Sequence, residues 1–211
     1  MKNINGTALK INKNFRGSIV DIKSPLAPFC SKKVLLPNDR LIKKAFAFAM
    51  KCHSGQMRKS GEPYFSHPKA VAEILVYEMG NCDPEVVAAT LLHDVVEDVE
   101  EVSIGDIQMM FGEKVSILVN GCTKVKSKSI SKSLAVSLTL QKLLHTAERY
   151  PEIMKIKLAD RLHNMDSIFV HKIDKQKRIA KETLNIYVPI AEKLNLKEHR
   201  NRLLFKALSV L

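Results

Sequence analysis

Residues 83–98 read DPEVVAATLLHDVVED, and this stretch indicates the class of fold. Asp83 followed by Pro84 is a typical helix start, because proline has no N–H to leave unpaired and its backbone angle suits the first helical position. The apolar run behind it predicts a helix from Pro84 to about Asp98. Apolar residues recur at helical spacing almost throughout from Asp39 onward, and alternating strand patterns are absent. We therefore expect an all-α bundle of roughly eight to ten short helices.

Breaks in the helical pattern divide the chain into segments. Residues 1–38 lack a sustained period and contain three prolines, which predicts an irregular basic leader. Residues 39–196 form the predicted main domain, and residues 197–211 a C-terminal helix. Inside the main domain, residues 123–133 are polar and rich in lysine, which predicts a mobile loop. Start and stop signals predict other helices over about 67–79, 134–149, 151–165 and 175–194, the last with a kink at Pro189.

The net charge of +12, from 34 basic and 22 acidic side chains, invites a nucleic-acid interpretation. The distribution of the charge along the chain does not suit a protein that only coats phosphates. Residues 1–38 carry 7 basic and 1 acidic side chains and residues 122–211 carry 19 and 8, whereas residues 39–121 carry 8 and 13. A protein that only coats phosphates has no need of an acidic centre, whereas a cation site flanked by anion-binding surface has this charge pattern. The charge distribution alone leaves both interpretations open, and it is the motifs described below that argue against a nucleic-acid partner.

The remaining composition excludes several classes of protein. No apolar run approaches the roughly 18 residues of a membrane span, so we expect no membrane partner. The amino terminus lacks the apolar stretch of a secretory signal. The four cysteines stand singly without a C-x-x-C pair, which suits reduced thiols and predicts a cytoplasmic protein. The glycine motifs of P-loop and Rossmann nucleotide sites are absent.

Four residues have the chemistry of a divalent-metal site, which proteins commonly build from neutral imidazoles and carboxylates. They are His67, the adjacent His93 and Asp94, and Asp160. Asp94 lies inside an apolar run, where an unpaired carboxylate is costly to bury, so it needs a cation or strong donors. From the residues alone, a buried His–Asp hydrogen bond without a metal explains the adjacent pair equally well.

Two further carboxylates follow this pair. Glu97 lies four residues after His93 and Asp98 four residues after Asp94, which on a continuous helix places the acids one turn along on nearly the same face. This arrangement suits metal-assisted hydrolysis, in which the metal lowers the pKa of bound water and a carboxylate orients the water or takes its proton. The alternative is a solvated acidic helix end.

A polar loop, residues 53–67, offers groups that suit a nucleotide. Arg58 can stack on a base and Lys59 can meet a phosphate, while Ser60 and Tyr64 supply hydroxyls. The alternative is an ordinary turn, because the glycines of this loop suit a turn just as well.

Five segments of the chain carry a family pattern, namely RKSGEPYFSHP (58–68), ATLLHDVVED (89–98), FGEKVSILVNGCTKV (111–125), KLADRLHNM (157–165) and ETLNIYVPIAEKL (182–194). In this order they resemble the hydrolase domain of the RelA/SpoT homologues, which belongs to the HD superfamily. The resemblance implies an HD-domain helical bundle and identifies residues 39–196 as an HD-type hydrolase domain. It also implies removal of the 3′-pyrophosphate from the alarmone (p)ppGpp.

The resemblance implies particular roles for the residues. It implies that the four metal-site residues bind one divalent ion, typically manganese. It also implies that Glu97 and Asp98 handle the attacking water and the pyrophosphate. Arg58 would stack on the guanine. The implied nucleotide-contacting residues are Arg58, Lys59, Ser60, Tyr64 and Asn164.

The chain also departs from the family pattern. Relatives often have Arg and Thr where Asp166 and Ser167 stand, so a negative charge replaces a positive one beside the expected nucleotide pocket. Among the other histidines, His163 is a candidate support for the metal ligands. For His53 we consider support of the nucleotide loop and a packing or hydrogen-bonding role. We expect His145, His171 and His199 at the surface.

The leading hypothesis is a metal-dependent hydrolase that converts (p)ppGpp to GDP or GTP and pyrophosphate. Two alternatives are an HD phosphohydrolase acting on another nucleotide, such as NADPH, and a degenerate alarmone-binding module without catalysis. The expected partner is a guanine nucleotide, captured with the help of basic side chains such as Lys124, Lys126 and Lys128. The sequence leaves the oligomeric state open.

Overall fold

A computed structural model describes residues 39–125 and 129–211. The predicted leader, Lys126 and Lys128 lie outside the described residues. The α-helices are α1 (Asp39–Cys52), α2 (Ser66–Glu73), α3 (Pro84–Leu92), α4 (Val95–Asp98), α5 (Ile104–Phe111), α6 (Glu113–Cys122), α7 (Lys132–Arg149), α8 (Ile153–Asp166), α9 (Ile173–Glu182), α10 (Val188–Lys193) and α11 (Lys197–Leu208). Within this part of the chain there is no β-strand, so the all-α prediction is confirmed.

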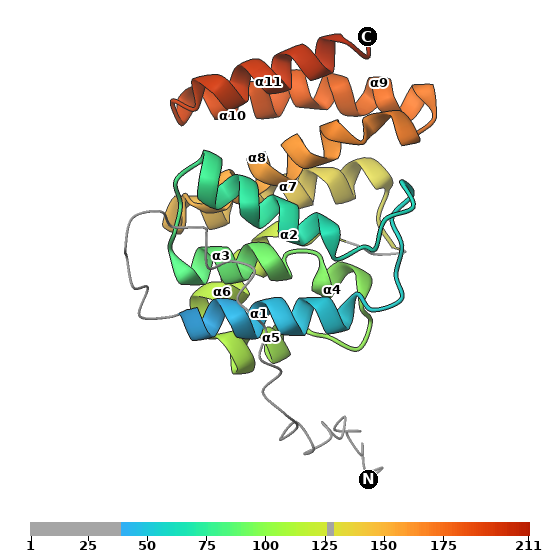
Figure 1. Cartoon of the computed structure of the whole chain (residues 1–211). Coiled ribbons are helices and arrows are strands. Elements are labelled where there is room, and N and C mark those ends of the chain that lie inside the picture. Colours follow the sequence, from blue (N-terminus) through green and yellow to red (C-terminus); the bar gives the residue numbers. More distant parts are fainter. Residues whose placement is uncertain (1–38, 126–128) are drawn as a thin grey trace.

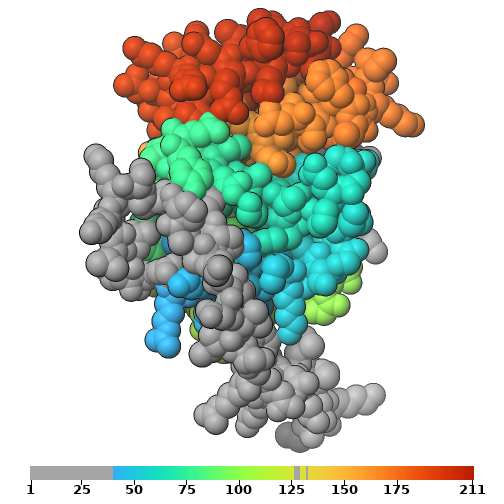
Figure 2. All heavy atoms as spheres, viewed as in Figure 1, coloured from blue at the N-terminus to red at the C-terminus, as the bar shows by residue number. Residues whose placement is uncertain are grey.

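Helix α8 occupies the middle of the bundle (Figure 1). On one side of it lie α1 to α6, where α1 packs on α3 and α3 packs on α6. On the other side, α9, α10 and α11 form one end of the molecule, and α11 packs directly on α8. Figure 2 shows the same end as a continuous cap over the part that contains α2. Helix α8 therefore contacts both α2 and α11, which are far apart in the sequence.

The core explains why α3 and α8 are central. Every residue of α3 from Val86 to Leu92 is buried, as the unbroken apolar run predicts. Helix α8 buries its apolar residues on several sides, including Ile156 and Leu162. The close approach of α6 to α8 requires Gly121, because a Cβ at this position would lie 2.5 Å from Ile153 Cδ1.

The predicted continuous helix over 84–98 is wrong. Helix α3 ends at Leu92, and His93 and Asp94 form a turn before α4 begins at Val95. The Thr90 carbonyl, which a continuous helix would pair with the Asp94 N–H, accepts a hydrogen bond from His93 Nδ1 at 2.7 Å. His93 and Asp94, two of the predicted metal-site residues, therefore lie in a turn and not on the face of a regular helix.

Two other predicted helices also contain irregular turns. The helix predicted over 67–79 is α2 followed by a π-helical turn at Ile74–Glu78. The helix predicted over 175–194 comprises α9, a π-helical turn at Thr183–Tyr187 and α10, so the disturbance expected at Pro189 lies just before that proline. Across residues 39–125 and 129–211, no helix combines the length and the apolar character that a membrane crossing needs.

Candidate active site

The predicted metal-site residues meet at one point. His67 lies in the first turn of α2, His93 and Asp94 in the turn between α3 and α4, and Asp160 on α8. The His67 Nε2 atom lies 3.4 Å from Asp94 Oδ2 and 3.2 Å from Asp160 Oδ1. One ligand atom each of His67, His93 and Asp160 lie within 4.8 Å of one another, and His93 Nε2 lies 3.4 Å from Asp94 Oδ1. The structure brings together all four residues.

The His93 ring has a nitrogen suited to a cation. Its side chain is 1% exposed, and Nδ1 donates its proton to the Thr90 carbonyl. The opposite atom, Nε2, is buried and has no hydrogen-bond partner. A buried polar atom without a partner is costly, and a metal ion bound to this lone pair would remove the cost. The donor set therefore fits a divalent metal.

In the cluster, neighbouring opposite charges outweigh the effect of burial on the pKa values of Asp160 and His93. Burial opposes ionisation of Asp160, but Lys157 and the two histidines outweigh it and hold the pKa of Asp160 well below its usual range. The Lys157 Nζ atom lies 3.3 Å from Asp160 Oδ2. Burial alone would lower the pKa of His93, but Asp94 and Asp160 raise it to about 9. A cation placed among these groups would replace protons.

Two residues that the family pattern assigned to the nucleotide make hydrogen bonds to carboxylates of the cluster. The Tyr64 hydroxyl donates to Asp94 Oδ2 at 2.9 Å, and the Tyr64 ring stacks on His53 with centroids 4.7 Å apart. Asn164 Nδ2 donates to Asp160 Oδ1 at 2.6 Å. Both side chains also line the adjoining cavity, so they connect the metal-site residues to the space where a substrate would bind.

A cavity of about 430 Å³ adjoins the cluster. Every predicted site residue except His93 lines it. Arg58 reaches across it from the loop before α2, and its Nη2 atom lies 3.4 Å from both Asn164 Oδ1 and Ser167 Oγ. Lys59 and Ser60 are exposed at its edge. The cavity thus combines carboxylates at its base with cationic and hydroxyl groups at its rim.

The predicted acidic pair diverges in the structure. Glu97 is 7% exposed, and its carboxylate accepts hydrogen bonds from the Lys124 backbone N–H at 2.5 Å and from Lys124 Nζ at 2.8 Å. Asp98 is exposed and lines the cavity close to the Tyr64 hydroxyl. The expectation of a shared helix face fails because α3 and α4 are separate helices. The two acids therefore differ in their freedom to act on a bound water.

The sequence profile of the HD domain matches residues 45–197. The chain belongs to the HD-domain family. Membership implies a divalent metal ion, which agrees with the histidine and aspartate cluster of the structure.

Several proteins are similar to this HD domain. A GTP pyrophosphokinase rsh of Brucella ovis is 41% identical over 167 residues, which are 79% of this chain and 22% of that protein. A GTP pyrophosphokinase of Streptomyces coelicolor is 43% identical over 157 residues, 74% of this chain and 18% of that protein. A probable guanosine-3′,5′-bis(diphosphate) 3′-pyrophosphohydrolase of Synechocystis is 41% identical over 157 residues, 74% of this chain and 20% of that protein. The chain therefore spans about a fifth of the length of these relatives.

A solved structure described as a metazoan ortholog of SpoT that hydrolyses ppGpp is also similar. It superposes with a TM-score of 0.56 and 30% sequence identity, covering 81% of this chain and 93% of that one. The resemblance to the hydrolase domain of the RelA/SpoT homologues is confirmed.

The site also contains a largely buried cation, Lys157, that was not predicted from the sequence. Lys157 lines the cavity beside Asp160, and its side chain is only 15% exposed. Its position three residues before Asp160 in an apolar stretch was a usable signal, because a lysine on that face of a buried helix needs an anionic partner. Ser167 and His171 also line the cavity.

The other histidines of the HD domain differ in burial. The His163 Nδ1 atom lies 2.9 Å from His67 Nδ1, and burial, His67 and Arg58 lower the pKa of His163 to about 4. The predicted surface position of His199 is wrong, because the ring is 4% exposed. Its Nε2 atom lies 3.4 Å from Glu78 on the π-helical turn after α2, a long-range contact that no local pattern shows.

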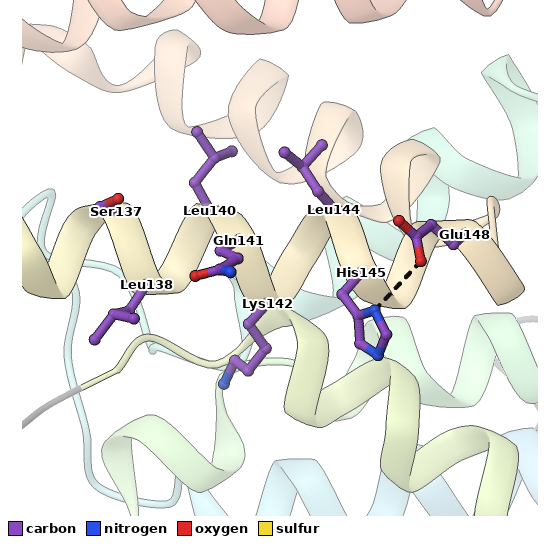
Figure 3. Close-up of a pocket in the computed structure, with 8 residues that line it drawn as sticks. All are labelled: Ser137, Leu138, Leu140, Gln141, Lys142, Leu144, His145 and Glu148. Carbon is purple, nitrogen blue, oxygen red and sulfur yellow. Dashed lines mark ion pairs between the residues drawn. The ribbon is translucent and has the colours of Figure 1, made fainter.

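A second hollow of the HD domain has a different character. It measures about 730 Å³, and its lining among the described residues comes from α7 alone. Figure 3 shows Leu140 and Leu144 on one side of this helix and Lys142 and His145 on the other. Its one ion pair, His145 with Glu148 at 3.3 Å, is exposed. None of the predicted site residues lines this hollow, so the smaller cavity is the candidate active site.

Proposed function

We propose that the chain hydrolyses the 3′-pyrophosphate of (p)ppGpp to give GDP or GTP and pyrophosphate. The single observation that carries the proposal is the cavity in which the histidine and aspartate cluster, an exposed carboxylate and the Arg58 arm face one another. The names of the Synechocystis relative and of the similar solved structure point to the same substrate. The proposal concerns the activity of this chain, which is shorter than its bacterial relatives.

In this proposal His67, His93, Asp94 and Asp160 hold one divalent ion, and manganese is the expected metal. Bound there, the ion would lower the pKa of a water molecule and neutralise charge on the phosphate. Tyr64 and Asn164 orient Asp94 and Asp160 through the hydrogen bonds described above. Lys157 keeps Asp160 ionised and adds a positive charge at the base of the cavity.

Asp98 is the better candidate for the proton acceptor. Its carboxylate is exposed to the cavity, whereas Glu97 is held by two donors of Lys124. We infer that Asp98 accepts a proton from the attacking water, and that Glu97 holds Lys124 near the pyrophosphate. Water adds to the phosphorus attached to the 3′-oxygen, and the bond between that phosphorus and the 3′-oxygen breaks. The 3′-oxygen is the leaving group and takes up a proton to become the 3′-hydroxyl of GDP or GTP, while the attacked phosphorus, now carrying the water oxygen, is released as part of pyrophosphate.

The rim of the cavity suits a polyphosphorylated nucleotide. Arg58 presents a planar cation that can stack on guanine, and Lys59 and Ser60 can meet phosphate oxygens. Tyr64 and Asn164 border the same space. We place the protein in the cytoplasm, because the four cysteines of the sequence stand singly without a C-x-x-C pair.

The test is turnover by the full chain with manganese. The purified protein is incubated with ppGpp, pppGpp or NADPH, and the products are separated by ion-exchange chromatography. We expect GDP or GTP and pyrophosphate, and no release after Asp160→Ala. Turnover of NADPH alone would favour a hydrolase for another nucleotide, and binding of ppGpp without turnover at any manganese concentration would favour a binding module. Either result would overturn the proposal.

A further inference from the structure

Two histidine rings from different helices face each other behind the metal cluster. His67 on α2 and His163 on α8 place their Nδ1 atoms 2.9 Å apart, with ring centroids 4.9 Å apart. A separation of this length is a hydrogen bond, and a nitrogen–nitrogen hydrogen bond requires one nitrogen with a proton and one with a lone pair. His67 is 3% exposed, so protein groups rather than solvent surround its ring.

The opposite nitrogen of His67 decides which way this hydrogen bond must run. The Nε2 atom faces Asp94 and Asp160 at 3.4 and 3.2 Å. To bind a metal ion there, Nε2 needs its lone pair, so the proton of the neutral ring must lie on Nδ1. In that arrangement His67 Nδ1 donates to His163 Nδ1, and His163 carries its own proton on Nε2.

We propose that His163 is a positioning residue, which accepts the His67 Nδ1 proton and thereby holds His67 in the tautomer and orientation that bind the metal. The proposal rests on the metal-ligand assignment but not on the identity of the nucleotide. His93 has the matching arrangement, because its Nδ1 donates to the Thr90 carbonyl at 2.7 Å. Both imidazoles of the cluster are thus oriented through Nδ1, one by a backbone oxygen and one by a second ring.

The position of His163 on α8 supports this role. It lies three residues after Asp160, and its neighbour Asn164 donates to Asp160 at 2.6 Å. One turn of α8 therefore supplies a proposed ligand, a donor to that ligand and an acceptor for the ligand on α2. Movement of this turn would disturb both sides of the cluster together.

The first test compares His163→Phe with His163→Gln. Phenylalanine fills the space without an acceptor, whereas the glutamine side-chain carbonyl can accept the His67 proton. Manganese binding to the full chain is measured by isothermal titration calorimetry, with His145→Phe on α7 as a control because His145 is 85% exposed. We expect about a 10- to 100-fold weaker affinity for His163→Phe, recovery in His163→Gln, and no change in the control. Binding of manganese to folded His163→Phe at the wild-type affinity would overturn the proposal.

The second test needs no substitution, so it decides even where His163→Phe does not fold. Protein labelled with ¹⁵N and loaded with zinc, which is diamagnetic, is studied by NMR of the imidazole nitrogens. We expect a proton bonded to His67 Nδ1 with a scalar coupling across the hydrogen bond to His163 Nδ1. A proton bonded to His163 Nδ1 would overturn the proposal. Neither test uses ppGpp, so a failure of the proposed function would show separately in the turnover assay.

Discussion

The Asp166 carboxylate lies 2.5 Å from the ammonium group of Lys206. Asp166 ends α8 and Lys206 lies on α11, so the pair joins the centre of the bundle to its cap. Asp166 is absent from the cavity lining, whereas the next residue, Ser167, lines the cavity and lies 3.4 Å from Arg58 Nη2. Of the two residues that depart from the family pattern, Asp166 therefore directs its negative charge toward α11, and Ser167 places a hydroxyl beside the space for the nucleotide.

Neutralising this pair should leave catalysis unchanged. For Asp166→Asn and Lys206→Met we expect KM and kcat for ppGpp close to those of the wild type, because neither side chain faces the cavity. The free energy of unfolding should fall by less than about 1 kcal/mol, since the pair is partly exposed and screened by solvent. Steady-state kinetics and urea unfolding give the two quantities. A large decrease in KM for Asp166→Asn would show that the carboxylate repels the nucleotide after all.

Removing one proposed ligand should strongly weaken metal binding without unfolding the protein. For Asp160→Asn we expect a loss of manganese affinity greater than the roughly 10- to 100-fold typical of an outer support. Activity should fall in parallel and should return in part at high manganese concentration. Calorimetry measures the affinity, and Asp174→Asn on the exposed start of α9 is the control. Retention of tight binding by Asp160→Asn would remove this residue from the ligand set.

The residues of the cluster could be predicted because their chemistry is local. Imidazole and carboxylate groups can be identified from the residue type alone. The order of the motifs along the chain then assigns these residues to one domain. The turn at His93 and Asp94 could not be predicted, because its cause is a side chain bonding to the Thr90 carbonyl inside a run that reads as helix. The spacing of apolar residues does not show that a side chain will take a backbone carbonyl from the helix in this way.

The residues that support the cluster could be predicted only in part. The pattern assigned Tyr64 and Asn164 to the nucleotide, but their hydrogen bonds to Asp94 and Asp160 join residues 30 and 4 positions apart. The burial of His199 likewise depends on how α11 meets the end of the turn at Glu78. The contacts of Tyr64 and His199 are set by the packing of distant segments, which single-sequence spacing does not encode. The contact of Asn164 with Asp160 is different, because the two residues lie one turn apart on α8 and the sequence shows this spacing.

The two acids of α4 should respond differently to loss of charge. For Asp98→Asn we expect kcat to fall about 10²- to 10⁴-fold, the usual loss when a proton-transfer group is removed, with manganese affinity nearly unchanged. For Glu97→Gln we expect chiefly a higher KM, because Lys124 loses its charged partner. Kinetics at saturating manganese separate the two effects. An unchanged kcat in Asp98→Asn would transfer the proton-accepting role to another group.

Lys157 should matter most when the metal is absent. Its ammonium group is the buried partner of Asp160, and breaking a buried ion pair by removing one member typically costs about 3–5 kcal/mol. For Lys157→Met we therefore expect a large loss of stability with EDTA and a much smaller loss with manganese, which compensates the carboxylates. Urea unfolding under both conditions is the measurement, and Lys155→Met on the same helix is the control. Equal losses in both conditions would contradict this electrostatic explanation.

The pH dependence of the metal-free protein should run in the opposite direction to that of metal binding. Burial lowers the pKa of His93, but Asp94 and Asp160 outweigh it and raise the folded-state pKa to about 9, above the roughly 6.5 of an unfolded histidine. A raised pKa means that the imidazolium stabilises the fold fully below about pH 6.5, and that this contribution is lost as the pH rises toward 9. With EDTA present, the free energy of unfolding should therefore fall across this window.

Metal binding requires the same nitrogen without its proton, so the apparent manganese affinity should rise across the same window, by up to about tenfold for each pH unit per proton displaced. The stabilisation that manganese confers should increase correspondingly from pH 6.5 to 9. Urea unfolding with EDTA or manganese gives both slopes, and calorimetry in buffers of different ionisation enthalpy counts the protons released. His93→Gln should flatten the slope measured with EDTA, because glutamine does not titrate. A manganese affinity independent of pH would show that His93 is already neutral before the metal binds, and the proton would then have to be sought elsewhere in the cluster.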